Sequence, residues 1–71
     1  MQTYRVVLLD RLNDDPTEQD LRAVSPRAAA EAALAAANGR GSFTDALVIE
    51  NHDGALGEEY WYRVWLDGSL I

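Results

Sequence analysis

The sequence contains no cysteine and no lysine, and it has a single histidine and two prolines. Without cysteine, the chain can form neither a disulfide framework nor a thiolate metal site. The one histidine, His52, lies in Asn51-His52-Asp53-Gly54, which is typical of a turn, and no pattern of a base with a nucleophile accompanies it. We therefore expect a protein that is not an enzyme and that binds no cofactor.

The acidic residues do not form a recognisable site in the sequence. Those between Asp10 and Asp20 lack the alternate spacing and the central glycine of a calcium-binding loop. Glu58 and Glu59 cannot act as a catalytic pair, because neighbouring residues of a strand point to opposite faces. The sequence predicts no metal site and no paired-carboxylate chemistry.

Acidic residues outnumber basic residues by twelve to six, which gives a formal charge of −6 and an isoelectric point near 4.4. A negative field repels phosphate backbones and attracts basic partners, so the charge disfavours direct nucleic-acid binding. The chain opens with Met-Gln-Thr-Tyr-Arg-Val-Val, which has no basic leader followed by an apolar run. We expect a soluble, cytoplasmic protein with no membrane span.

At 71 residues the chain has room for one domain, residues 1–71, with one modest core. Apolar and β-branched runs separated by turn-forming residues predict four strands. The expected strands are Tyr4–Leu9, Gln19–Val24, Ala46–Glu50 and Glu59–Asp67, with a long acidic loop after the first strand and a loop from Asn51 to Glu58 before the last. These elements predict an α+β fold of order β-β-α-β-β, in which one alanine-rich helix packs on a mostly antiparallel four-stranded sheet.

The expected helix has clear start and stop signals. Ser25 suits the N-cap, Pro26 suits the first helical position, and Asn38-Gly39 ends the helix. Residues 28–37 are alanine except for one glutamate and one leucine, and alanine is the best helix former. Because the helix offers so little side-chain volume, we expect aromatic residues of the sheet to fill most of the core. The expected core stripe of the helix is Ala30, Ala33, Leu34 and Ala37.

The last expected strand carries a dense aromatic pattern, Tyr60-Trp61-Tyr62-Arg63-Val64-Trp65-Leu66. Alternation places its tyrosines on one face and its tryptophans on the other. One helix covers only one face of a small sheet, so one aromatic row enters the core and the other lies on an open surface. The residues expected to face the helix are Tyr4, Val6, Leu8, Leu21, Ala23, Tyr60, Tyr62 and Val64. Those expected on the open face are Arg5, Val7, Leu9, Arg22, Val24, Trp61, Arg63 and Trp65.

Tryptophan and arginine on an open sheet face have three physical uses. They anchor protein interfaces, they stack single-stranded bases, and their mutual stacking stabilises a sheet by about 0.5–1 kcal/mol without any ligand. The negative charge of the chain favours a protein partner over nucleic acid. The predicted partner-binding residues are Trp61, Arg63 and Trp65 as the contact row, Arg5 and Arg22 beside it, and Asp14, Asp15, Glu58 and Glu59 as acidic groups that imitate phosphates.

Two resemblances bear on function. Residues 20–33, DLRAVSPRAAAEAA, resemble a strand–cap–helix pattern of small phage and mobile-element proteins, and the expected topology and size are similar to those of some anti-CRISPR inhibitors. The opening residues Tyr4-Arg5-Val6-Val7-Leu8, followed by this helix, also resemble HicB-type antitoxins. The first resemblance implies a small inhibitory protein that acts by binding a partner.

The sequence thus predicts a small, acidic, non-enzymatic module that binds a larger protein, one with a basic nucleic-acid groove. A HicB-like antitoxin or a single-strand nucleic-acid-binding domain is the first alternative. A self-associating structural protein, with a homodimer built through the open face, is the second.

Overall fold

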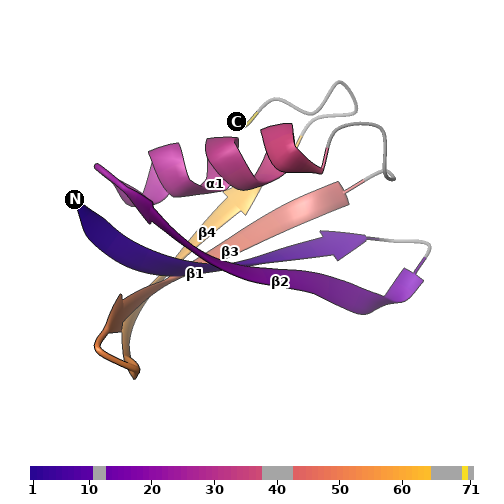
Figure 1. Ribbon diagram of the computed structural model, residues 1–71. Helices are drawn as coiled ribbons and strands as arrows, with labels where there is room; N and C mark the ends of the chain where they lie inside the picture. Colours follow the sequence, from indigo (N-terminus) through magenta and orange to yellow (C-terminus); the bar gives the residue numbers. More distant parts are fainter. Residues whose placement is uncertain (11–12, 38–42, 65–69, 71) are drawn as a thin grey trace.

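The computed structural model describes residues 1–10, 13–37, 43–64 and 70 of the chain. Its elements are β1 (Gln2–Asp10), β2 (Asn13–Ala23), α1 (Pro26–Ala36), β3 (Phe43–His52) and β4 (Ala55–Arg63). The four strands form one antiparallel sheet in the order β2-β1-β3-β4. The helix lies over one face of this sheet, and no described element lies over the other face (Figure 1). The predicted α+β class is confirmed.

The core lies between α1 and the two central strands, β1 and β3. Val6, Leu8 and Val48 are the largest fully buried side chains, and Tyr4 is almost fully buried beside them. All eight residues predicted to face the helix are buried or pack against the buried cluster, so this assignment is confirmed. The expectation that aromatic residues would dominate the core is wrong, because aliphatic residues of the central strands fill it and Tyr60 is only partly buried.

The start of α1 follows the predicted pattern. Ser25 has an extended backbone, with φ −157°, and its Oγ accepts a hydrogen bond of 3.1 Å from the backbone N–H of Ala28. Proline occupies the first turn, as predicted. Ala29, Ala30 and Ala33 are fully buried, and Leu34 and Ala37 are partly buried against the core, so the predicted stripe of Ala30, Ala33, Leu34 and Ala37 is confirmed. The helix therefore meets the sheet through the methyl groups of its alanines and the side chain of Leu34.

The prediction of a long acidic loop after β1 is wrong, because most of that segment belongs to β2. β2 begins at Asn13 and includes Pro16, and it pairs with β1 from Asp10↔Asn13 to Gln2↔Ala23. β2 is an edge strand, and an edge strand tolerates proline and charged residues because one side of its backbone has no sheet partner. The side chains of Asp14 and Asp15 lie outside the described part of the chain.

The predicted loop from Asn51 to Glu58 is instead a tight β-hairpin. Its two-residue turn, Asp53-Gly54, has φ values of +54° and +89°, and Asn51 Oδ1 accepts a 2.8 Å hydrogen bond from the Gly54 N–H. Asp-Gly favours this left-handed turn, which matches the twist of the flanking strands. β4 spans Ala55–Arg63, and Val64 then forms an isolated bridge with Leu70, while residues 65–67 of the predicted strand lie outside the described part of the chain. Trp65 lies outside the described residues.

Candidate functional site: the open face of the sheet

The face of the sheet opposite α1 carries a continuous row of apolar side chains. Val7 of β1 is paired with Leu47 of β3, which is paired in turn with Trp61 of β4. Residues directly opposite one another in antiparallel strands lie on the same face. Since Val6 and Val48 point into the core, Val7, Leu47 and Trp61 all point to the open face.

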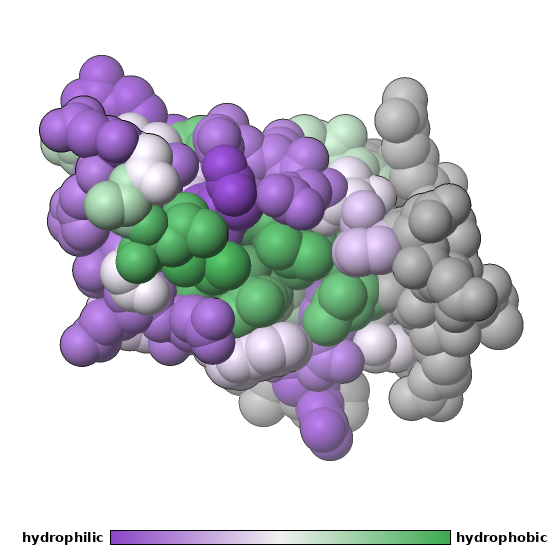
Figure 2. Space-filling model, turned by 90° about the horizontal axis from the view of Figure 1, so that it is seen from below, coloured by the Kyte–Doolittle hydropathy of each residue, from purple (hydrophilic) through white to green (hydrophobic). Residues whose placement is uncertain are grey.

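Three further apolar residues extend this row along the strands. Leu9 and Ile49 share the alternation of Val7 and Leu47. The register shifts between Ile49 and Asn51, and the shift places Leu56 opposite Asn51 and hence on the open face as well. We call the six residues Val7, Leu9, Leu47, Ile49, Leu56 and Trp61 the apolar strip. Figure 2 shows hydrophobic residues running across the middle of this face, with hydrophilic residues on both sides.

The apolar strip is exposed most strongly on β4. Trp61 is 60% exposed and Leu56 is 50% exposed, whereas the four strip residues on β1 and β3 are partly buried. Single exposed apolar residues are common on proteins, but a contiguous patch with a polar margin marks an interaction surface. A tryptophan at the edge of such a patch is the residue type most often found as an interface anchor.

One margin of the strip is formed by an arginine held between two carboxylates. Arg5 Nε donates a 3.0 Å hydrogen bond to Asp20 Oδ1 and lies 3.5 Å from Glu18 Oε1. The hydrogen bond to Asp20, followed by its charge, raises the pKa of Arg5. Arg22, the next arginine on β2, donates a 3.4 Å hydrogen bond to the backbone oxygen of Met1. Both predicted contact residues therefore already have partners within the chain.

The other margin is formed by β4. Glu59 is paired with Ile49, and Arg63 is paired with Asp45, so both side chains lie on the open face beside Trp61. Glu58 points the other way, toward Tyr60 on the helix side. Glu58 and Glu59 thus point to opposite faces of the sheet, as the alternation predicted. For the same reason, only Glu59 of the two borders the predicted contact row.

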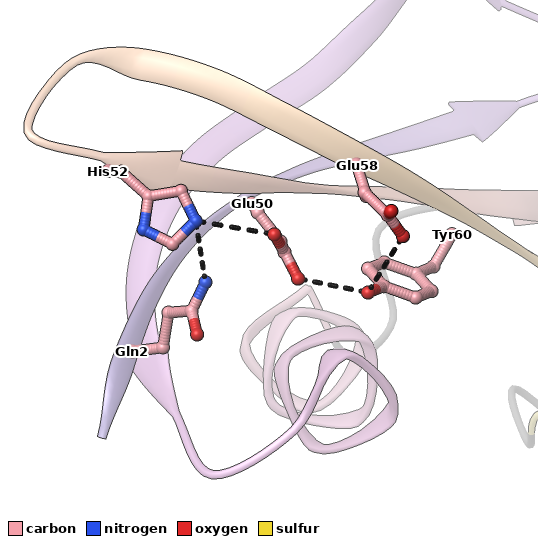
Figure 3. Close-up of polar contacts among 5 residues, drawn as sticks. All are labelled: Gln2, Glu50, His52, Glu58 and Tyr60. Atoms are coloured by element: carbon pink, nitrogen blue, oxygen red, sulfur yellow. Dashed lines mark hydrogen bonds and ion pairs between the residues drawn. The ribbon is translucent and has the colours of Figure 1, made fainter.

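A second polar arrangement, which the sequence did not suggest, lies on the helix side of the sheet near the β3–β4 turn (Figure 3). Tyr60 Oη donates a 2.9 Å hydrogen bond to Glu50 Oε2 and lies 3.5 Å from Glu58 Oε2. Glu50 Oε1 lies 3.3 Å from His52 Nε2, which lies 3.3 Å from Gln2 Nε2. We call these five residues the hairpin cluster. It connects both strands of the hairpin to the start of β1.

The hydrogen bonds of the hairpin cluster shift two pKa values. The bond from Tyr60, and then the contact with His52, lowers the pKa of Glu50. The same bond to the Glu50 carboxylate, with burial and the charge of Glu50, raises the pKa of Tyr60 to about 12. Tyr60 thus stays protonated at neutral pH and donates its hydrogen bond to Glu50. The hydrogen bonds of the hairpin cluster hold the two strands of the hairpin together and connect them to β1.

His52, predicted to be a solvated turn residue, is the last residue of β3, with a side chain that is 59% exposed and a carboxylate neighbour in Glu50. Within the described ranges, no three histidine, aspartate or glutamate side chains are grouped so as to hold a metal ion.

The described residues also contain no helix that could cross a membrane, for which about 20 apolar residues are needed. Comparisons of the chain with protein-family models, with curated proteins and with solved structures gave no match. The resemblances to anti-CRISPR inhibitors and HicB-type antitoxins therefore stay predictions from the sequence.

Proposed function

We propose that this protein is a non-enzymatic binding module that docks on a larger, basic protein through the open face of its sheet. The main observation in support of the proposal is that Trp61 is exposed at the edge of the apolar strip. Covering an exposed tryptophan and its apolar neighbours removes a large apolar area from water, which is the main driving force of protein association.

The charge of the chain supports a basic protein as the partner. The formal charge is −6, and the described charges on the open face are mixed: Arg5, Arg22 and Arg63 against Glu18, Asp20, Asp45 and Glu59. A single strand of nucleic acid would have to approach against the overall field, and Arg5 is already neutralised by Glu18 and Asp20. A protein surface rich in arginine or lysine meets no such barrier and is attracted from a distance.

The finer proposal is that the partner handles nucleic acid and that docking blocks its nucleic-acid groove. An acidic domain that covers such a groove brings the negative charge of the whole chain, −6, to a site that otherwise holds phosphates, although its open face is itself nearly neutral. The resemblance of residues 20–33 to small phage and mobile-element proteins points in the same direction. On this proposal, the protein is an inhibitor of the anti-CRISPR kind that acts in the cytoplasm.

The test begins with partner capture by the wild-type chain and by the variant Trp61→Ala. Glu58→Gln serves as the control, because Glu58 lies on β4 but points to the helix side. A partner of the open face is retained by the wild type and by Glu58→Gln and is lost with Trp61→Ala. The captured protein is then purified and mixed with labelled oligonucleotide, which the wild-type chain is expected to displace.

Two results contradict this function. If no captured protein depends on Trp61, the open face is not the docking surface. If the chain alone binds the labelled oligonucleotide, with an affinity that falls steeply as salt is added, the single-strand-binding alternative is correct instead.

A further inference from the structure

We propose that, in the free protein, a second copy of the chain covers the open face, with a two-fold axis running along the row Val7–Leu47–Trp61. These three residues are directly paired across β1, β3 and β4 and form the middle row of the apolar strip. An axis parallel to this row, between two sheets packed face to face, places each of the three side chains over its own counterpart. Such a contact is isologous, as in most homodimers.

The charges on β4 are arranged symmetrically about this axis. Glu59 and Arg63 lie two residues before and two residues after Trp61, on the same face. Each is therefore about 6.6 Å from the axis along the strand. The two-fold rotation brings Glu59 of one copy to Arg63 of the second copy, and Arg63 to Glu59. One operation thus forms two ion pairs, one on each side of the paired tryptophans.

The opposite end of the row is also compatible with a second copy. Glu18 is paired with Val7 across β2 and β1 and would lie near its own counterpart at the rim. Arg5, 3.5 Å from Glu18 and 3.0 Å from Asp20, offsets the repulsion there. The described charges of the face comprise three arginines and four carboxylates, so the face is nearly neutral although the chain carries −6. A nearly neutral face does not repel its own copy.

The size of the face suits a flat partner of equal extent. The four strands have nine to eleven residues. At a spacing of about 4.8 Å and a rise of about 3.3 Å per residue, they cover roughly 600 Å² in projection. A stable interface buries about 800 Å² of accessible surface on each partner. The whole face, with its margins, has to be covered to reach that area. A second four-stranded sheet packed on the first, as in a β-sandwich, does so.

The dimer has a consequence for binding, which rests on the function proposed above. The second copy covers the same apolar strip that the larger partner would use, so partner binding requires dissociation of the dimer. The dimer itself is tested without any partner. A failure to find a partner would therefore leave the result on the dimer unchanged.

The test is sedimentation equilibrium of the purified chain up to about 1 mM. We expect a monomer–dimer equilibrium for the wild type. Trp61→Glu places two like charges at the axis and is expected to raise the dimer dissociation constant by at least about 30-fold, the effect of losing a typical tryptophan anchor. Glu59→Arg is expected to weaken the dimer, and Glu59→Arg combined with Arg63→Glu is expected to restore it. Glu58→Arg, with the same change of charge on the opposite face, is the control and leaves the dimer intact.

Cooperative melting of each variant shows that it is folded, which matters for Arg63→Glu because Asp45 is its neighbour on β3. The proposal is overturned if the wild type is monomeric throughout, or if folded Trp61→Glu dimerises as well as the wild type. It is also overturned if the double charge exchange does not restore the dimer, or if Glu58→Arg weakens it as much as Glu59→Arg does.

Discussion

Leu8 and Leu47 provide a matched test of which face of the sheet is the core. They lie on the adjacent central strands β1 and β3, but Leu8 points toward α1 and Leu47 points to the open face. Leu8 is fully buried, whereas Leu47 is partly buried. The same substitution, leucine to alanine, therefore removes the same atoms from two different surroundings.

The expected costs follow from these surroundings. Leu8→Ala loses the transfer free energy of its side chain and leaves a cavity under the helix, at a cost of about 3–5 kcal/mol. Leu47→Ala leaves a space that water fills, so only part of the transfer term is lost, about 1–2 kcal/mol. A domain of this length has a free energy of unfolding of roughly 4–11 kcal/mol. Leu8→Ala therefore removes a large share of the stability, and Leu47→Ala a small one.

The assay is urea unfolding followed by circular dichroism, at a protein concentration low enough to keep the chain monomeric. If the two substitutions cost the same under these conditions, the division into a core face and an open face is incorrect. Repeating the measurement at high concentration adds a second readout. Because a dimer buries Leu47 but leaves the surroundings of Leu8 unchanged, only the wild-type advantage over Leu47→Ala should grow with concentration.

Three further predictions concern the cap, the turn and the hairpin cluster. Ser25→Ala removes the acceptor for the Ala28 N–H, so it should cost about 1 kcal/mol of stability, or roughly 4–8 °C in melting temperature. Ser25→Asp keeps an acceptor and should retain most of the stability. An equal loss in both variants would contradict capping by Ser25. Gly54→Ala should lower the free energy of chemical unfolding by about 1 kcal/mol, because φ is +89° at this position. No atom lies within 4 Å of an added Cβ, so the cost comes from the backbone conformation and not from a clash. An unchanged stability would contradict the turn geometry. Tyr60→Phe should lower the melting temperature most between about pH 5 and 10. The Glu50 pKa is lowered in the folded state, so the wild-type advantage declines below about pH 4 and is lost as pH falls through the lowered pKa. The Tyr60 pKa is raised to about 12, so the advantage also declines above about pH 10 and is lost as pH rises through about 12. A difference independent of pH would contradict the Tyr60–Glu50 bond.

The two faces of the sheet could be predicted from the sequence because the side chains alternate without interruption from Tyr4 to Leu9 and from Glu59 to Arg63. Once Tyr60 and Tyr62 are placed toward the helix, Trp61 must point away, and its 60% exposure agrees with this. The start of the helix could also be predicted from the sequence, since Ser25 and Pro26 act through local backbone geometry. These features depend on neighbours within a few residues, which a sequence displays directly.

The extent of β2 could not be predicted from local preference. Pro16 and the acidic residues around it favour a loop, but pairing with β1 supplies backbone hydrogen bonds that local preference does not include. Proline is tolerated in β2 because β2 lies at the edge of the sheet. The order of the strands cannot be predicted from the local sequence.

The hairpin cluster was missed for a related reason. Glu50 and Tyr60 are ten residues apart, and they meet only because the tight turn at Asp53-Gly54 sets the register of β3 and β4. The turn itself was predicted, but a long loop was expected around it. With the hairpin placed correctly, the meeting of Glu50 and Tyr60 would have followed from the pairing of Val48 with Tyr60.

The alternation of core and open-face residues along the central part of β1, β3 and β4 has an evolutionary consequence. The core is built from one set of positions, such as Val6 and Val48, and the proposed docking face is built from the residues between them, such as Val7 and Leu47. Mutations in the second set can accumulate with little penalty to the first. Such a domain can acquire a new target rapidly while its architecture persists, and descendants with the same skeleton could differ widely in what they bind.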